Sequence, residues 1–245
     1  NGEFEITYIA GSTYTIVSPA AATSGATGGG SVSAAYQLNI GTAVGVPIVG
    51  WGAGAWGIGV WGTGTPSVQP IRLWSQSNFG QSLIFGPRGG GIYFWDGNGS
   101  TSTRGVLVSG IGGASGVPTV QNILTTSDAS RFVFAIGAND FGTTTQNPML
   151  VRWSSQEDYL DWTPSATNQA GSLTLSRGSK LVAVMQARQE MLIWSDSALY
   201  SFQYVEPPIV WTSQLVGDNI SIASQNAMAY ANGVSYWMGK DKFYM

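Results

Sequence analysis

Short runs of apolar residues recur along the chain, and each run is separated from the next by polar or glycine-bearing turns. Several of these runs end in a tryptophan. The closing residues are Trp95, Trp153, Trp194 and Trp237. The last three are spaced by 41 and 43 residues, whereas Trp95 lies 58 residues before Trp153. A nearly constant interval indicates a repeated structural unit.

Each tryptophan-closed run follows another apolar run, and the last two such pairs predict tight β-hairpins. The runs at residues 181–185 and 191–194 are joined by Ala-Arg-Gln-Glu, and those at 227–230 and 234–237 by Ala-Asn-Gly. Asn-Gly supplies the positive φ angles that a tight hairpin turn requires. A recurrence of roughly 40 to 45 residues, built from short strands, is the spacing of β-propeller blades. We therefore predict an all-β chain of propeller blades, with the four tryptophans at equivalent places on their strands.

The N-terminal part of the chain has a different pattern. Residues 4–8 alternate between apolar and polar side chains, which is typical of a strand with one buried face. We predict that residues 1–44 are the end of a small additional β module at the N-terminus. Residues 45–70 are expected to form a Gly/Trp-rich linker or arm, and residues 71–245 an incomplete set of blades. Because predicted strands reach both ends of the sequence, and open strand edges promote aggregation, we expect a segment of a longer polypeptide.

The Gly/Trp-rich tract contains Trp51, Trp56 and Trp61, which recur every five residues and are each followed by glycine. A period of five fits neither a strand nor a helix. Three interpretations remain open. The indoles dock on a neighbouring subunit, since tryptophan is enriched at interface hot spots; or they stack on sugar rings; or they fold back onto the chain's own sheets. We predict these three residues as intersubunit contacts.

The composition bears on the function in three ways. Charged residues make up 9% of the chain and aromatic residues 12%, whereas ordinary soluble domains carry about 25% charged residues. A surface with so few charges suits a subunit that its neighbours cover. There is no cysteine and no histidine, which excludes thiolate metal sites and Cys- or His-based nucleophile pairs. A net charge of −3 with scattered basic residues argues against a nucleic-acid clamp.

One acidic cluster, formed by Glu157, Asp158 and Asp161, is a candidate for chemistry. A calcium loop of the EF-hand type requires acids at alternate positions and a distal glutamate, which this cluster lacks. Paired acids of glycosidases face each other across a cleft and normally come from separate strands. We therefore expect a solvated turn, with Tyr159 and Trp162 as its apolar anchors, and we predict no catalytic residue, no metal site and no cofactor.

A triple glycine follows Pro87 and Arg88, and a glycine-rich stretch beside a cation can form a phosphate cradle. A P-loop also requires Lys-Ser/Thr and a following helix, and neither is present in the sequence. We expect a hairpin turn here. No stretch of about 18 apolar residues exists, so the sequence predicts no membrane-spanning segment.

A resemblance to a known family is found in four stretches of the chain. They are residues 50–96, 153–164, 178–185 and 193–200. Their tryptophan-rich strand edges resemble those of structural tail proteins of short-tailed, podovirus-type bacteriophages, in particular the nozzle or tail-hub (tail tubular) proteins. The resemblance implies β-propellers in a ring of copies, hexameric in this family, below the portal and adaptor in the virion tail. Neighbouring partners would be the adaptor and a tail fibre or spike. Genomic DNA would contact the wall only in transit during ejection.

The leading hypothesis is therefore a non-enzymatic structural component of a phage tail. A receptor- or carbohydrate-binding tail protein that uses Trp51, Trp56 or Trp61 is the second hypothesis. A propeller glycosidase that uses Glu157, Asp158 or Asp161 is the third. A glycan array separates the second from the first, and a reducing-end assay separates the third.

Overall fold

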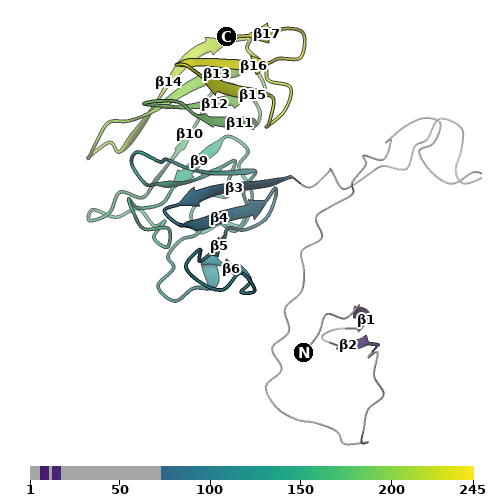
Figure 1. The fold of residues 1–245 in the computed structure, drawn as a ribbon. Helices are drawn as coiled ribbons and strands as arrows, with labels where there is room; N and C mark the ends of the chain where they lie inside the picture. The colour runs from purple at the N-terminus through teal and green to yellow at the C-terminus, as the bar shows by residue number, and fades with distance from the viewer. Residues whose placement is uncertain (1–5, 11–12, 18–72) are drawn as a thin grey trace, which may run out of the picture. The chain divides into compact units, whose positions relative to one another are not determined.

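The computed structural model describes residues 6–10, 13–17 and 73–245 (Figure 1). The chain divides into two units, residues 1–39 and 40–245, which are described separately. In the first unit, strands β1 (Ile6–Ala10) and β2 (Thr13–Ile16) form an antiparallel hairpin in which Tyr8 pairs with Tyr14. The predicted strand at residues 4–8 overlaps β1, and the extent of an N-terminal β module over residues 1–44 stays a prediction. The Gly/Trp-rich tract lies outside the described residues.

Residues 73–245, the described part of the second unit, form four antiparallel sheets, which follow one another along the chain and are numbered in that order. Sheet 1 consists of β3 (Trp74–Phe79), β4 (Ser82–Pro87), β5 (Tyr93–Trp95) and β6 (Val106–Leu107). Sheet 2 consists of β7 (Ile123–Thr126), β8 (Val133–Ile136), β9 (Leu150–Trp153) and β10 (Gly171–Thr174). Sheet 3 consists of β11 (Leu181–Gln186), β12 (Met191–Ser195), β13 (Ala198–Tyr204) and β14 (Trp211–Asp218). Sheet 4 consists of β15 (Met228–Ala231), β16 (Val234–Met238) and β17 (Phe243–Tyr244). A 3-10 turn, η1 (Val108–Gly110), follows β6.

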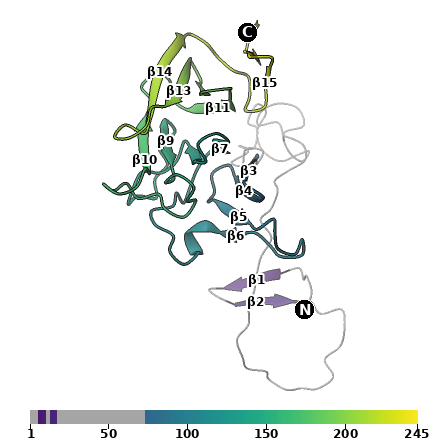
Figure 2. The ribbon, with the colours of Figure 1, turned by 60° about the vertical axis from the view of Figure 1, so that its left-hand side comes forward.

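The sheets are arranged as β-propeller blades. The first strands of successive sheets lie beside one another, β3 with β7, β7 with β11 and β11 with β15. Figure 2 shows these four strands around a common centre, with the later strands of each sheet farther out. Meandering sheets that radiate from a central channel are the architecture of propellers. The predicted fold class, all-β with propeller blades, is confirmed.

Each junction between successive sheets is filled by one apolar cluster. The cluster between sheets 1 and 2 includes Ile84, Ile92, Val108, Leu124, Val133 and Ala135. The cluster between sheets 2 and 3 includes Phe132, Phe134, Ile136, Val151, Met191, Ile193, Phe202 and Trp211. The cluster between sheets 3 and 4 includes Ala183, Met185, Leu192, Trp194, Leu199 and Trp237.

Side-chain alternation explains how one strand serves two junctions. On β12, Met191 and Ile193 point toward sheet 2, whereas Leu192 and Trp194 point toward sheet 4. Successive side chains of a strand lie on opposite faces, so a strand between two neighbours is apolar at every position. All five residues of β12 are accordingly buried.

The hairpin turn between β15 and β16 has the predicted conformation. Asn232 has a φ of 52° and Gly233 a φ of 82°, so both central residues are left-handed. Two successive positive φ angles characterise the type I′ turn, which matches the twist of the strands it joins. The register Ala231–Val234 follows from this turn.

The predicted equivalence of the four tryptophans is wrong. Trp194 and Trp237 lie on the second strands of sheets 3 and 4, β12 and β16. Trp95 and Trp153 end the third strands of sheets 1 and 2, β5 and β9. The interval between Trp153 and Trp194 therefore joins the third strand of sheet 2 to the second strand of sheet 3. The first strands of successive sheets begin farther apart than the predicted spacing, because outer strands and long connections lie between them.

Arg152 on β9 is a fully buried cation that sequence reasoning did not single out. Its Nη1 donates to the Asn139 carbonyl at 3.1 Å, and its Nη2 donates to the carbonyls of Trp162, at 3.4 Å, and of Gly116. Its guanidinium also lies 3.8 Å from the centre of the Phe141 ring. Burial lowers the pKa of Arg152 to about 10, against a raising effect of Asp140. The side chain joins three connecting segments around sheet 2 through a planar set of donors, which arginine can supply and lysine cannot.

Replacing Trp194 by alanine should lower the free energy of unfolding by about 3–5 kcal/mol, because it leaves a cavity between sheets 3 and 4. Trp194 is fully buried, and its ring meets that of Trp237 at 5.5 Å between centroids. Phe243→Ala is the matched control, since Phe243 is 80% exposed. Chemical denaturation of dilute protein measures both. Equal losses for the two variants would contradict a packed layer at this junction.

Arg152→Met should lower the free energy of unfolding by about 2–4 kcal/mol, because it leaves three carbonyl groups without their donor. Arg152→Lys should recover part of this loss, since one ammonium cannot reach all three segments. Arg188→Met, at an exposed position in the β11–β12 turn, should change stability by less than about 0.5 kcal/mol. Thermal melting compares the three variants. A wild-type melting curve for Arg152→Met would show that the guanidinium does not hold these segments.

Candidate functional site

A pocket of about 420 Å³ lies where the first strands of the four sheets meet. Its walls come from β3, β7, β11 and the segment that enters β15. Apolar surface is provided by Trp74, Val184 and Met228 among others. The polar groups at the pocket are uncharged, and they belong to Ser75, Gln76, Thr125, Gln225 and Asn226.

A short chain of hydrogen bonds crosses the pocket from sheet 1 to the segment before β15. Gln225 Nε2 donates to Ser75 Oγ at 3.0 Å, and both side chains are buried. Arg88 Nη2 donates to Gln225 Oε1 at 3.4 Å. These bonds join parts of the chain that are 150 and 137 residues apart. The amide of Gln225 therefore ties the beginning of the blade array to its end.

Three other polar side chains at the pocket make no side-chain hydrogen bond to a described residue. Gln76 and Asn226 are exposed and Thr125 is half-buried, and none of them makes a side-chain hydrogen bond to another described residue. Neutral donors and acceptors beside an indole suit an uncharged ligand that carries hydroxyl or amide groups. Among the described residues, the lining holds no ammonium or guanidinium group with which to bind phosphate.

The acidic cluster lies in the predicted turn. The Leu160 amide donates to Asp158 Oδ1 at 2.8 Å, and Asn168 Nδ2 donates to Asp161 Oδ2 at 2.7 Å. Glu157 pairs with the exposed Arg131 at 3.7 Å. Each carboxylate thus stabilises the local backbone or meets a surface cation. Within the described residues no group of three or more acids could hold a metal ion.

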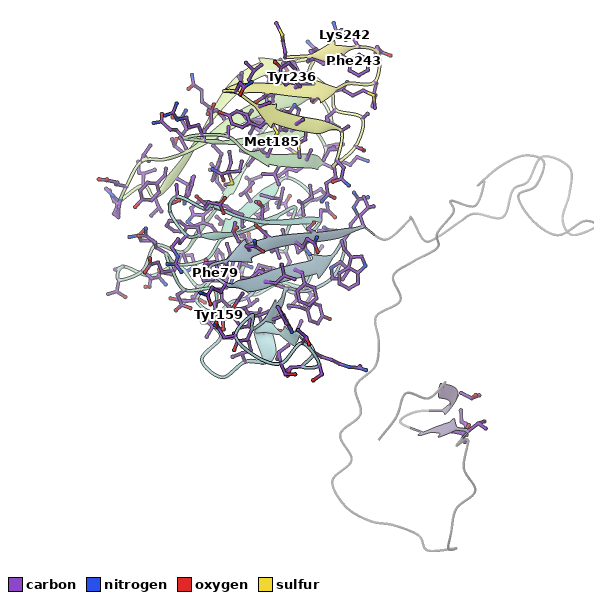
Figure 3. All side chains as sticks on the ribbon, viewed as in Figure 1. Phe79, Tyr159, Met185, Tyr236, Lys242 and Phe243 are labelled. Atoms are coloured by element: carbon purple, nitrogen blue, oxygen red, sulfur yellow. The ribbon has the colours of Figure 1, made fainter. Side chains whose placement is uncertain are left out.

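The two predicted apolar anchors of this turn behave differently. Trp162 is fully buried, and its Nε1 donates to the Tyr159 carbonyl at 2.8 Å. Tyr159 stacks on Phe94 at 4.3 Å between ring centroids. It also meets Phe79 edge to face at 5.8 Å, and Figure 3 labels these two residues. Burial raises the pKa of the Tyr159 phenol, and the carboxylates of Asp158 and Asp96 raise it further. The turn is thus anchored against sheet 1 by aromatic contacts.

Three backbone amides of the glycine-rich stretch after Pro87 already donate hydrogen bonds to backbone carbonyls. The amides of Arg88, Gly89 and Gly90 donate to the carbonyls of Leu73, Gln121 and Pro87 at 2.8, 2.7 and 3.0 Å. An anion cradle requires several amide hydrogens that point at one empty site. The stretch connects β4 to β5, as the sequence predicts, and holds sheet 1 to sheet 2.

Sheet 4 exposes an apolar face on the side away from sheet 3. Cross-strand pairs place Tyr236 with Ala229 and Met238 with Phe243 on this face. Phe243 is 80% exposed, and Tyr236 and Met238 are 45% and 44% exposed. Figure 3 shows Tyr236 and Phe243 on this outermost sheet. Contiguous exposed apolar residues mark interaction sites, which makes this face a candidate interface.

The sequence-predicted contact residues Trp51, Trp56 and Trp61 lie outside the described residues, so their role stays a prediction. The pocket residues were missed because they are single neutral side chains from four distant segments, and only the fold brings them together. The apolar face of sheet 4 could have been recognised, since the alternate residues Val234, Tyr236 and Met238 are all apolar or aromatic.

The described residues contain no helix that is long and apolar enough to cross a membrane. No protein-family model matches the chain, and no curated protein matches it. Among solved structures, the chain is similar to that of the crystal structure of Kluyvelomyces marxianus Hsv2, with 8% sequence identity and a TM-score of 0.38. The match covers 69% of this chain and 44% of the other, so the chain spans less than half of that protein. A likeness at this level supports no argument about function, and the fold rests on the strand pairing described above.

Proposed function

We propose that the chain is a structural component of a short-tailed bacteriophage tail, a nozzle-type ring subunit that forms part of the genome-ejection conduit. The proposal is non-enzymatic and requires no cofactor. Its family assignment is supported by the sequence resemblance of the tryptophan-rich strand edges. Its structural character is supported by the surfaces of the blade array.

The observation that carries the proposal is the uncharged apolar face of sheet 4. Phe243, Tyr236 and Met238 form an exposed apolar face among the described residues, and such faces mark interaction sites. Charged residues, at 9% of the chain, are too few to keep copies apart by mixed-sign surface charge. A subunit that neighbours cover on several sides would have both properties.

The charge balance suits a wall past which DNA moves. The chain has 10 basic and 13 acidic residues, so a ring of copies carries a weakly negative charge. Affinity for DNA depends on clustered cations that neutralise phosphates. A wall without such clusters would let the genome pass without holding it. The proposed partners are therefore other copies, the adaptor and a fibre or spike, with DNA only in transit.

Immunogold electron microscopy tests the proposal. Antibody raised against this chain should label the tail of purified phage particles that carry its gene, at the vertex where the tail joins the capsid. Antibody depleted on the purified chain is the control and should label nothing. Gold on the capsid faces, or antigen found only in the infected host and not in particles, would contradict a tail component.

A carbohydrate-binding role is the second candidate, and the pocket between the first strands favours it. Trp74 offers an aromatic face, and Gln76 and Asn226 offer free amides beside it. This site differs from the predicted Trp51, Trp56 and Trp61. Stacking on an aromatic ring together with neutral hydrogen bonds suits a sugar. The glycosidase hypothesis has no comparable support, because Asp158 and Asp161 accept hydrogen bonds within their own turn.

A glycan array with the purified chain tests the second candidate. Selective retention of a neutral glycan is expected if the pocket binds sugar, and Gln76→Ala together with Asn226→Ala should reduce it about tenfold or more, the loss of two hydrogen bonds. Both side chains are exposed, so the double variant should keep its fold. Retention that survives this change would exclude the pocket, and an array without any selective signal would exclude the role.

A further inference from the structure

The pocket between the first strands has walls of two kinds. Its middle walls are β7 and β11, which belong to sheets 2 and 3 and are joined by an apolar cluster. Its outer walls are β3, with Trp74 and Gln76, and the segment that enters β15, with Asn226 and Met228. The width of the pocket between its outer walls therefore depends on the contacts that hold β3 to this segment.

The side chain of Gln225 joins the two outer walls. Its Nε2 donates to Ser75 Oγ at 3.0 Å, and the two side chains are 8% and 5% exposed. Its Oε1 accepts from Arg88 Nη2 at 3.4 Å. A guanidinium can only donate, so it holds the amide oxygen and turns the amide nitrogen toward Ser75. Ser75, Arg88 and Gln225 are called the clasp from here on.

The turn that presents Gln225 is fixed to sheet 4. The Ala223 amide donates to the Met238 carbonyl at 2.8 Å, and the Met238 amide donates to the Ala227 carbonyl at 2.9 Å. The Ala227 amide closes the turn on the Ser224 carbonyl at 3.2 Å. Both ends of the turn are thus held by β16, and breaking the clasp would leave the turn in place on sheet 4.

The clasp is weaker than the apolar contacts around it. Sheets 3 and 4 share the buried rings of Trp194 and Trp237, whose centroids are 5.5 Å apart, and burial of such rings is strongly stabilising. A neutral hydrogen bond contributes little net stability, because both partners bond to water when it breaks. Among the described residues, the Ser75–Gln225 bond is therefore easier to break than the apolar layers, and weakly held regions open most often.

We propose that the clasp sets the width of the pocket, which is narrow while Gln225 is bonded to Ser75 and wider when this bond is broken. In the open state the wall that carries Asn226 moves away from β3, while the apolar cluster keeps β7 and β11 in place. Val184 on β11 lines the pocket and is 8% exposed, and it becomes accessible in the open state. A neutral ligand bonded to both Gln76 and Asn226 would join the same two walls and would bind the closed state more tightly. The inference goes beyond the proposed functions, since it requires neither the tail assignment nor a sugar.

Thiol labelling of the full chain tests the inference. The chain contains no cysteine, so Val184→Cys places one thiol on the pocket wall, at a buried apolar site of the kind that suits cysteine. The rate at which the folded protein reacts with a bulky maleimide measures how often the pocket opens. Ser75→Ala in this background removes the acceptor of Gln225 and should accelerate labelling about fivefold or more.

Ser77→Ala is the matched control. It removes a hydroxyl from the same strand, but Ser77 Oγ bonds at 2.6 Å to Thr126 Oγ1 of sheet 2 and not to sheet 4. This variant should label within about twofold of the parent, because its lost bond does not hold the outer walls together. Gln225→Glu keeps acceptors for both Arg88 and the Ser75 hydroxyl, so it should label no faster than the parent.

Equal labelling of Ser75→Ala and its parent would overturn the inference. An equal acceleration in Ser75→Ala and Ser77→Ala would also overturn it, because labelling would then follow overall stability. Arg88→Met, which removes the group that orients the amide, decides the question if circular dichroism shows that Ser75→Ala does not fold. It should accelerate labelling about twofold or more, and a rate equal to that of the parent would contradict the clasp. A glycan array without signal would reject the sugar-binding candidate and leave this result unchanged.

Discussion

The apolar layer between sheets 2 and 3 is the contact on which the rest of the array depends. Trp211 lies at its centre, with the rings of Phe134, Phe202 and Phe132 at 4.9, 5.4 and 5.6 Å. Both sheets are buried on two faces, so a register shift of one residue in either would move each apolar set to the wrong junction. The layer therefore fixes the register of the middle sheets, and through their opposite faces it positions sheets 1 and 4.

The sequence predicted the strands that form clear apolar runs, including the mostly exposed hairpin of β15 and β16, and missed strands of mixed composition. β8 and β12 form continuous apolar runs because both faces are covered, and their pattern was recognisable. β14 is mostly exposed and its residues are mainly polar, and β6 is short and exposed at both positions. Such outer strands have no apolar run by which to detect them. Without them the repeat interval linked Trp153 to Trp194, although these residues lie on different strands of their sheets.

Among the candidate sites, the one formed by neighbouring residues could be predicted, and those formed by distant residues could not. The turn around Asp158 and Asp161 could be predicted because local hydrogen bonding settles its geometry. The pocket could not, because Ser75 and Gln225 are 150 residues apart and only the closing of the blade array brings them within 3.0 Å. Buried Arg152 was equally invisible, since its three carbonyl partners belong to segments with no recognisable pattern. The buried polar side chains of Arg152 and Gln225 thus serve internal cohesion.

Hydrogen exchange at a dilution where the chain is monomeric tests the central claim, that apolar layers between neighbouring sheets hold the described blades together. β12 and β16 are both flanked by hydrogen-bonded strands, but β17 pairs with β16 only at Trp237 and Met238, so the comparison is made between these two residues and β12. β12 has an apolar layer on each face and β16 on one. The account predicts markedly slower exchange in β12 than in β16, since the most protected amides belong to the most buried elements. Equal exchange in the two strands would contradict it.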